Sequence, residues 1–130
     1  MSSPTDPPDH DPRRPRRLYA VGSEPDPRFT FANERTFLAW IRTGLGFLAA
    51  GVALVAVAQL NAPLGLEVRI ASVLLILCGL VSGVGAYTRW MRNERALRLS
   101  RPLPSSRLIP FLTIGLVLVA LVAFAVVSLR

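Results

Sequence analysis

The sequence predicts an all-α membrane protein with three transmembrane helices and a disordered N-terminal tail. Residues 43–66, 70–88 and 108–129 carry no Asp, Glu, His, Lys or Arg. Each stretch is close to the ~20 residues that a helix needs to cross a bilayer. Composition agrees, because 52% of the 130 residues are hydrophobic and the mean hydropathy is +0.44. A soluble domain of this size would be covered in apolar surface, whereas a bilayer accommodates it.

Residues 1–25 are rich in Pro, Asp, Ser and Arg, a composition typical of a disordered tail. Residues 26–130 are expected to form the three-span membrane domain. Asp26 can cap the first helix and Pro27 can occupy its first turn. The expected helices lie at about residues 28–60, 70–98 and 108–129.

Two connections are expected between the spans. Residues 61–65, Asn-Ala-Pro-Leu-Gly, should end the first helix, and residues 67–69 should form a short polar link. The four-residue spacing of Glu94 and Arg98 indicates that the second helix continues past its apolar part. Residues 101–106, Arg-Pro-Leu-Pro-Ser-Ser, should form the loop before the third helix.

The basic residues are all arginine and are distributed unevenly, which predicts the orientation. Seven lie on the N-terminal side and six between the second and third spans, against two on the other face. The positive-inside rule therefore predicts a cytoplasmic N-terminus, in the inner membrane, with the C-terminus on the outer face. Trp40, Tyr87 and Trp90 fall at the same boundary, where amphipathic rings prefer to lie. The +7 net charge predicts contact with anionic lipid and requires no nucleic acid partner.

No catalytic or metal site is expected. Cys78 is the single cysteine, lies inside the second apolar stretch and is interpreted as a small packing residue. His10 is the single histidine and has no second ligand nearby. Because the chain has no Ser/His/Asp set, no Cys/His set and no paired carboxylates, we expect neither an enzyme nor a cofactor.

Polar chemistry enters a span in residues 28–44. Arg35 and Arg42 lie on one helix face, two turns and ~10 Å apart. In one interpretation they are interfacial anchors above a tight helix contact. In the other, several copies turn this face towards a shared axis, and the arginines select phosphate-like anions. The small residues that continue this face are Gly46, Ala49 and Ala53.

The same segment holds a carboxylate and an amide at the membrane boundary. Glu34 points about a quarter turn from the arginine face, and such a carboxylate is costly unless paired. We expect Arg89 or Arg92, at the end of the second span, to pair with it. Asn33 either hydrogen-bonds across helices or starts a turn.

Small residues predict where the helices pack closely. Gly79 and Gly83 form a small-xxx-small motif in the second span, and Ser72 and Ala86 extend the same face. The expected packing glycines are Gly44, Gly46, Gly51, Gly79 and Gly83.

Residues 31–44, Phe-Ala-Asn-Glu-Arg-Thr-Phe-Leu-Ala-Trp-Ile-Arg-Thr-Gly, resemble the hallmark of the YidH-like family of small membrane proteins, a domain-of-unknown-function family. The three-span layout and residues 87–95 fit that family. The domain is also similar to the membrane part of the eukaryotic vacuolar transporter chaperone, which assembles as a ring and passes polyphosphate through a basic pore. The residues that this resemblance implies at a pore mouth or its entrance are Glu34, Arg35, Arg89 and Arg92.

Two functions remain open. The first is a homo-oligomeric pathway for phosphate or polyphosphate, with Arg35 and Arg42 as selectors. The second is a structural subunit that binds other membrane proteins and transports nothing. An oligomer is expected in both, because three helices in one copy cannot shield Glu34, both arginines and every strip of small residues.

Overall fold

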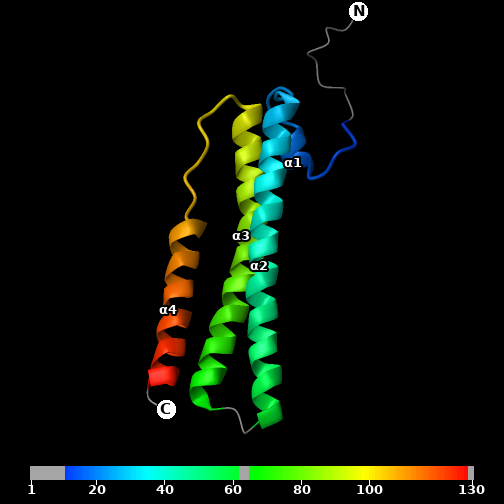
Figure 1. Ribbon diagram of the computed structural model, residues 1–130. Helices are drawn as coiled ribbons and strands as arrows, with labels where there is room; N and C mark the ends of the chain where they lie inside the picture. Colours follow the sequence, from blue (N-terminus) through cyan, green and yellow to red (C-terminus); the bar gives the residue numbers. More distant parts are fainter. Residues whose placement is uncertain (1–10, 62–64, 129–130) are drawn as a thin grey trace, which may run out of the picture. The chain divides into compact units, whose positions relative to one another are not determined.

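The computed structural model describes residues 11–61 and 65–128. Three of its helices are long and apolar enough to cross a membrane, with mean hydropathies of 1.9, 2.2 and 2.8 in chain order. No strand occurs in the described residues, so the predicted all-α, three-span fold class is confirmed. The helices are α1 (Arg16–Tyr19), α2 (Pro27–Asn61), α3 (Leu66–Arg98) and α4 (Leu108–Ser128) (Figure 1).

The start of α2 follows from local sequence signals as predicted, but the start of α3 differs from the prediction. The Asp26 carboxylate accepts a hydrogen bond from the Arg28 amide at 2.9 Å, so α2 begins with the predicted cap and proline. The prediction of a polar link at residues 67–69 was wrong, because α3 already begins at Leu66. Glu67 instead lies in the first turn of α3, where the helix dipole favours a carboxylate. Within the predicted break, residues 62–64 lie outside the described residues.

The chain divides into two compact units, and α2 and α3 contribute to both. The first comprises Met1–Leu38 and Tyr87–Ser105, described from residue 11 onward, and is called the polar unit below. The second comprises Ala39–Ala86 and Ser106–Arg130, described at residues 39–61, 65–86 and 106–128, and is called the apolar unit.

In the apolar unit, glycines let the backbones of α2 and α3 approach closely. A Cβ atom added to Gly44 would lie 3.1 Å from the Gly79 carbonyl oxygen, and one added to Gly51 would lie 3.1 Å from the Ser72 carbonyl oxygen. Ser82 is fully buried, and its hydroxyl donates to the Trp40 carbonyl at 3.0 Å. Side chains larger than hydrogen at these glycines would separate the helices, so the small-residue face is a packing surface.

Helix α4 packs against α3 at two points of the apolar unit. Gly85 of α3 faces the Leu108 side chain, and Gly115 of α4 faces the sulfur of Cys78. Cys78 is buried, which confirms its interpretation as a packing residue. Along α4 Leu112 is the buried residue, and most other side chains are exposed in this single copy. Because these side chains are apolar, a lipid environment suits them.

In the polar unit, the segment before α2 is ordered from residue 11. The prediction of a disordered tail over residues 1–25 was therefore wrong for residues 11–25, while residues 1–10 lie outside the described part. Leu18 of α1 is 3% exposed, and the Ser23 amide donates to the Arg98 carbonyl at 3.1 Å. Gly22 has a φ of +65° and lies against the same carbonyl, where a side chain would collide. Composition missed this order because the partner lies in α3, more than seventy residues away.

Candidate functional site

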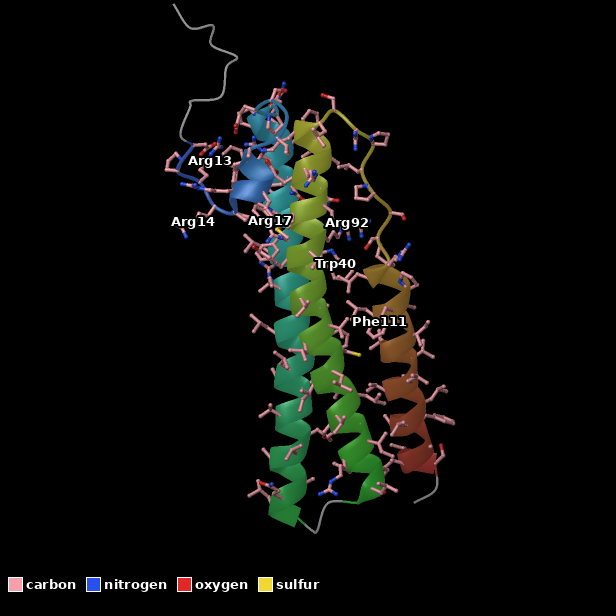
Figure 2. All side chains as sticks on the ribbon, turned by 180° about the vertical axis from the view of Figure 1, so that it is seen from behind. Arg13, Arg14, Arg17, Trp40, Arg92 and Phe111 are labelled. Atoms are coloured by element: carbon pink, nitrogen blue, oxygen red, sulfur yellow. The ribbon has the colours of Figure 1, made fainter. Side chains whose placement is uncertain are left out.

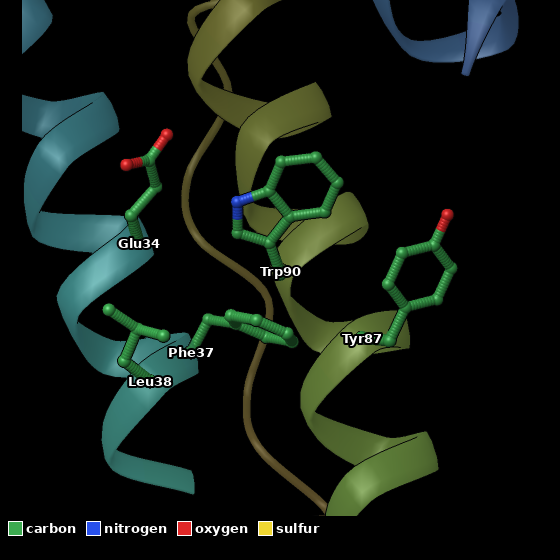
Figure 3. Close-up of a pocket in the computed structure, with 5 residues that line it drawn as sticks. All are labelled: Glu34, Phe37, Leu38, Tyr87 and Trp90. Carbon is green, nitrogen blue, oxygen red and sulfur yellow. The ribbon is translucent and has the colours of Figure 1, made fainter. Parts of the chain in front are cut away.

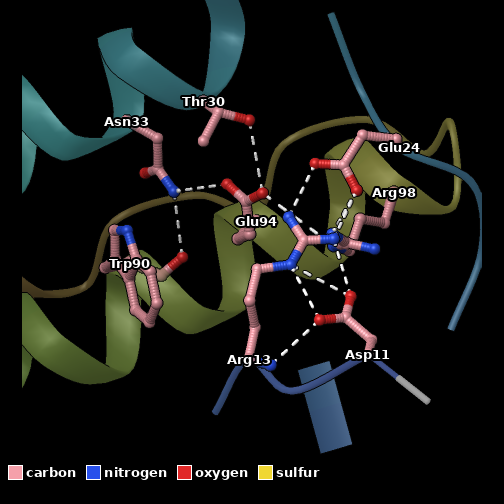
Figure 4. Close-up of polar contacts among 8 residues, drawn as sticks. All are labelled: Asp11, Arg13, Glu24, Thr30, Asn33, Trp90, Glu94 and Arg98. Atoms are coloured by element: carbon pink, nitrogen blue, oxygen red, sulfur yellow. Dashed lines mark hydrogen bonds and ion pairs between the residues drawn. The ribbon is translucent and has the colours of Figure 1, made fainter. Parts of the chain in front are cut away.

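The polar side chains gather in the polar unit around a buried carboxylate. Glu94 of α3 is 1% exposed, and its carboxylate accepts hydrogen bonds from the Thr30 hydroxyl at 3.3 Å and from the Asn33 amide at 3.4 Å (Figure 4). Arg98, one helical turn further along, lies with its Nε atom 3.9 Å from Glu94 Oε1 and is 3% exposed. Buried charges require such partners, because desolvation otherwise disfavours the ionised form.

Asn33 connects α2 to α3 through both ends of its side-chain amide. Its nitrogen donates to the Trp90 carbonyl at 3.1 Å, and its oxygen accepts from the Asn93 amide at 3.2 Å. Asn33 is 7% exposed, so these contacts are shielded from water. Of the two roles that the sequence allowed for Asn33, the structure has the hydrogen bond across helices.

The segment before α2 attaches to the end of α3 through a chain of ion pairs. Glu24 lies 2.9 Å from the Arg98 guanidinium and 2.8 Å from that of Arg13, and Arg13 also pairs with Asp11 at 2.6 Å (Figure 4). The Tyr19 ring lies 4.6 Å from the Arg13 guanidinium carbon and 4.7 Å from that of Arg98. Two cations on one ring are favourable contacts that add to the ion pairs.

These ion pairs make the attachment of residues 11–25 sensitive to acid. Hydrogen bonds from Arg13 lower the pKa of Asp11 to about 2, and the hydrogen bond from Arg13 is also the largest cause that lowers the pKa of Glu24. A depressed pKa contributes stability that is complete above the unfolded value and is lost as the pH falls through the folded value. We expect hydrogen exchange of the α1 amides, corrected for its intrinsic rate, to stay slow down to about pH 4.5 and to accelerate between about pH 4 and pH 2.

A charge-neutral variant provides the control for this acid effect. Glu24→Gln should exchange faster at neutral pH already, because it weakens the contacts to Arg13 and Arg98. Uniform protection down to about pH 2 in the unmodified chain would show that the ion pairs do not hold the segment.

Glu34 is placed differently from the expectation. Its side chain is exposed, and the ion pairs of the described residues use other carboxylates, so the expected pairing with Arg89 or Arg92 is not among them. Glu34 instead lines a pocket of about 350 Å³ with four apolar or aromatic side chains (Figure 3). The other lining residues are Phe37, Leu38, Tyr87 and Trp90.

The predicted arginines of the polar unit differ in their exposure. Arg35 and Arg92 are exposed, and Arg89 is half-buried. Figure 2 shows Arg92 on α3 and the side chains of Arg13, Arg14 and Arg17 on the segment before α2. These cationic groups give the polar unit its basic character.

The apolar unit separates the predicted packing glycines into two groups. Gly44, Gly51 and Gly79 have neighbours on the facing helix within 3.2 Å of an added Cβ atom. Gly46 and Gly83 have no atom within 4 Å of such a position. Arg42, which shares the face of Gly46 by helical spacing, is exposed as well. Among the described residues, no other helix therefore packs closely at Gly46 on the face expected to carry the arginines and small residues.

Sequence reasoning missed the central role of Glu94 and the contribution of Thr30. The spacing of Glu94 and Arg98 was visible as a helical pair, but such pairs usually lie on solvated faces. Glu94 is one of two carboxylates in α3, and it follows Asn93 in a segment that otherwise carries arginines. That combination of amide and carboxylate amid basic residues is the signal that could have indicated a buried polar cluster.

Comparison with known proteins places the chain in a family. The profile of a domain of unknown function, DUF202, matches residues 28–96. Inner membrane protein YidH of Escherichia coli K12 is 42% identical over 113 residues, which cover 85% of this chain and 96% of the relative. The chain belongs to the DUF202 family.

A second relative comes from another bacterium. Uncharacterized protein Rv2272 of Mycobacterium tuberculosis H37Rv is 50% identical over 109 residues, covering 83% of this chain and 88% of the relative. No solved structure matches the chain. This DUF202 protein is a small, multi-pass inner-membrane protein, because it is similar to YidH and has three helices that are apolar enough to cross a membrane. The YidH-like resemblance read from residues 31–44 is confirmed.

Proposed function

We propose that this DUF202 protein assembles into a homo-oligomer in the inner membrane, in which one face of α2 lines a pathway for phosphate-like anions. The observation that supports this proposal is that, among the described residues, Arg35, Arg42 and Gly46 on this face of α2 are all exposed. In the apolar unit, Arg42 and Gly46 are exposed, whereas Gly44 and Gly51 are buried against α3. In the polar unit, Arg35 is exposed too.

The chemistry of the exposed face supports anions as cargo. A guanidinium keeps its charge at every physiological pH and binds phosphate oxygens through two parallel hydrogen bonds. Small side chains below the arginines would leave room along a shared axis, as expected for a narrow pathway. Phosphate and polyphosphate are the candidate cargoes. They are the cargoes implied by the resemblance to the vacuolar transporter chaperone, which stays a prediction. With the N-terminus in the cytoplasm, as the arginine count predicts, Arg35 would lie at the cytoplasmic mouth.

Anion flux tests the pathway. Purified protein in vesicles should release entrapped phosphate or short polyphosphate, and Arg42→Ala should reduce the rate by about tenfold or more, because one charge-assisted contact is lost. Arg35→Ala should act in the same direction. Arg69→Ala is the matched control, since it removes an exposed arginine from α3. Absence of flux from the unmodified protein would exclude the pathway and favour a structural subunit.

Substitutions of two glycines of α2, Gly46 and Gly44, test the oligomer separately from the anion flux. Gly46→Leu should convert the oligomer into monomers with little change in thermal stability, because nothing within 4 Å of an added Cβ atom opposes it in the chain. Gly44→Leu should instead unfold the helix pair, because its Cβ atom would lie 3.1 Å from the Gly79 carbonyl. Light scattering of the detergent-solubilised protein measures the mass. A monomeric unmodified protein would contradict the proposal.

A further inference from the structure

We propose that the pocket between Glu34, Phe37, Tyr87 and Trp90 in the polar unit binds the ammonium group of an organic cation. This site is independent of the anion pathway, because it uses neither Arg35 nor Arg42. Either proposal can therefore fail without the other. The ligand class is a small alkylammonium group, free in the cytoplasm or carried by a lipid headgroup.

Three aromatic rings line the pocket from two helices. Phe37 of α2 and Trp90 of α3 have ring centroids 6.4 Å apart at an angle of 55°, and the Tyr87 centroid lies 6.0 Å from that of Trp90. A cation is attracted by ring faces within about 6 Å of their centroids. The tilted rings of Phe37 and Trp90 can contact one cation together, and Tyr87 extends the aromatic surface by stacking on Trp90.

The charge of the lining matches a cation. The lining surface is almost entirely apolar, Glu34 carries the one carboxylate among the five lining residues, and none of the five is basic. Figure 3 shows the Trp90 ring between Glu34 on one side and Tyr87 on the other, with Phe37 reaching across from α2. An anion would meet both the carboxylate and the negative ring faces, which disfavours it.

The buried network next to the pocket holds the two helices in this arrangement. The amide of Asn33, directly before Glu34, donates to the carbonyl of Trp90 at 3.1 Å. That bond holds Trp90 of α3 against α2. The aromatic rings of the two helices are therefore close together before a ligand binds. Preorganisation of this kind lowers the cost of ordering a site during binding.

The size of the pocket suits a small ligand. Its volume of about 350 Å³ falls at the lower end of the range of ligand sites in proteins. Leu38 contributes an apolar wall, which suits the methyl groups of a substituted ammonium. Tetramethylammonium and choline are therefore the probes that match the pocket in charge, shape and size.

The binding test uses Trp90 as its own reporter. The chain has two tryptophans, and Trp40→Phe leaves Trp90 as the single tryptophan of the full-length protein, which can be excited selectively over the tyrosines. Titration with choline should change its fluorescence saturably. The neutral isostere 3,3-dimethylbutan-1-ol has the same shape without the charge, and should bind about tenfold more weakly or worse. Equal responses to both would overturn the proposal, because the pocket would then be an apolar slot.

Two variants identify the groups that bind. Glu34→Gln keeps the shape of the lining and should weaken choline binding by about tenfold, since the opposite charge is lost. Tyr87→Leu should weaken it by a smaller factor because it removes one ring. Both residues are exposed, so the fold should tolerate the changes. Glu67→Gln, which alters a carboxylate outside the pocket, is the control. Unchanged binding by Glu34→Gln would overturn the proposal.

Nanodiscs distinguish the two sources of the ammonium group. In nanodiscs of phosphatidylglycerol alone, choline should titrate Trp90 as in detergent. If addition of phosphatidylethanolamine suppresses that titration, the lipid headgroup occupies the pocket. If the titration is the same in both, the ligand is a free ammonium compound. No saturable response in detergent or in either nanodisc would contradict the site itself.

Discussion

Replacing Glu94 with alanine should destabilise the protein by about 3 kcal/mol. The carboxylate is 1% exposed and accepts hydrogen bonds from Thr30 and Asn33. Its removal would leave the Arg98 guanidinium, itself 3% exposed, without its buried anionic neighbour. Loss of one partner of a buried pair costs more than the pair contributes, because the remaining charge stays desolvated. Arg98 would keep its ion pair with Glu24, which is more exposed than Glu94. The expected loss of stability is therefore at the lower end of the usual range for a broken buried pair.

Thermal unfolding in mild detergent, followed by tryptophan fluorescence, measures this loss. Glu94→Gln should fall between alanine and the unmodified protein, because an amide oxygen can still accept one hydrogen bond. Glu34→Ala is the matched control, since it removes an exposed carboxylate from the same unit and should change stability by less than about 0.5 kcal/mol. If Glu94→Ala unfolded at the same temperature as Glu34→Ala, the buried network would have no structural role.

Gly79→Val should cost about 2 kcal/mol by forcing α2 and α3 apart. A Cβ atom at Gly79 would lie 2.9 Å from the Gly44 carbonyl oxygen and 2.6 Å from the Cγ atom of Leu48. The leucine could rotate, but the carbonyl belongs to the backbone of α2 and moves only with its helix. In a membrane, helix association depends on such close packing because lipid and side chains are equally apolar.

Gly83→Val provides a matched control on the same helix. It lies one turn away in the same small-xxx-small motif, yet no atom lies within 4 Å of an added Cβ atom. Thermal unfolding should therefore separate the two substitutions clearly, with Gly83→Val close to the unmodified protein. Equal destabilisation would mean that the motif acts through helix propensity rather than through the contact with α2.

The candidate site was only partly predictable from sequence. Glu34 lies at the predicted membrane boundary and was therefore expected to pair with Arg89 or Arg92, but its side chain is exposed. Glu94 was expected to extend a solvated helix, but it is buried beside Asn33. Helical spacing gives the relative angles of residues on one helix, and it does not give the rotation of that helix against its neighbour. That rotation decided which of the two carboxylates entered the polar cluster.

The order of residues 11–25 shows the same limit. Their composition is polar and proline-rich, which predicts disorder when the segment is considered alone. The Glu24 contact to Arg98 joins residues 74 positions apart, and the Leu18 side chain is buried in the folded chain. Interactions with a partner so distant in sequence leave no periodic pattern in the segment itself.

The three spans, the cap of α2 and the glycines available for packing can all be predicted from the order of the amino acids. These features are local, because a bilayer requires about 20 apolar residues in a row and a helix satisfies its backbone hydrogen bonds within the segment. Tertiary structure alone decided that Gly44 and Gly79 pack while Gly46 and Gly83 stay open. It also placed Thr30, 64 residues from Glu94, beside that carboxylate. Such choices depend on how one helix is turned against another, and that orientation is a property of the packed pair.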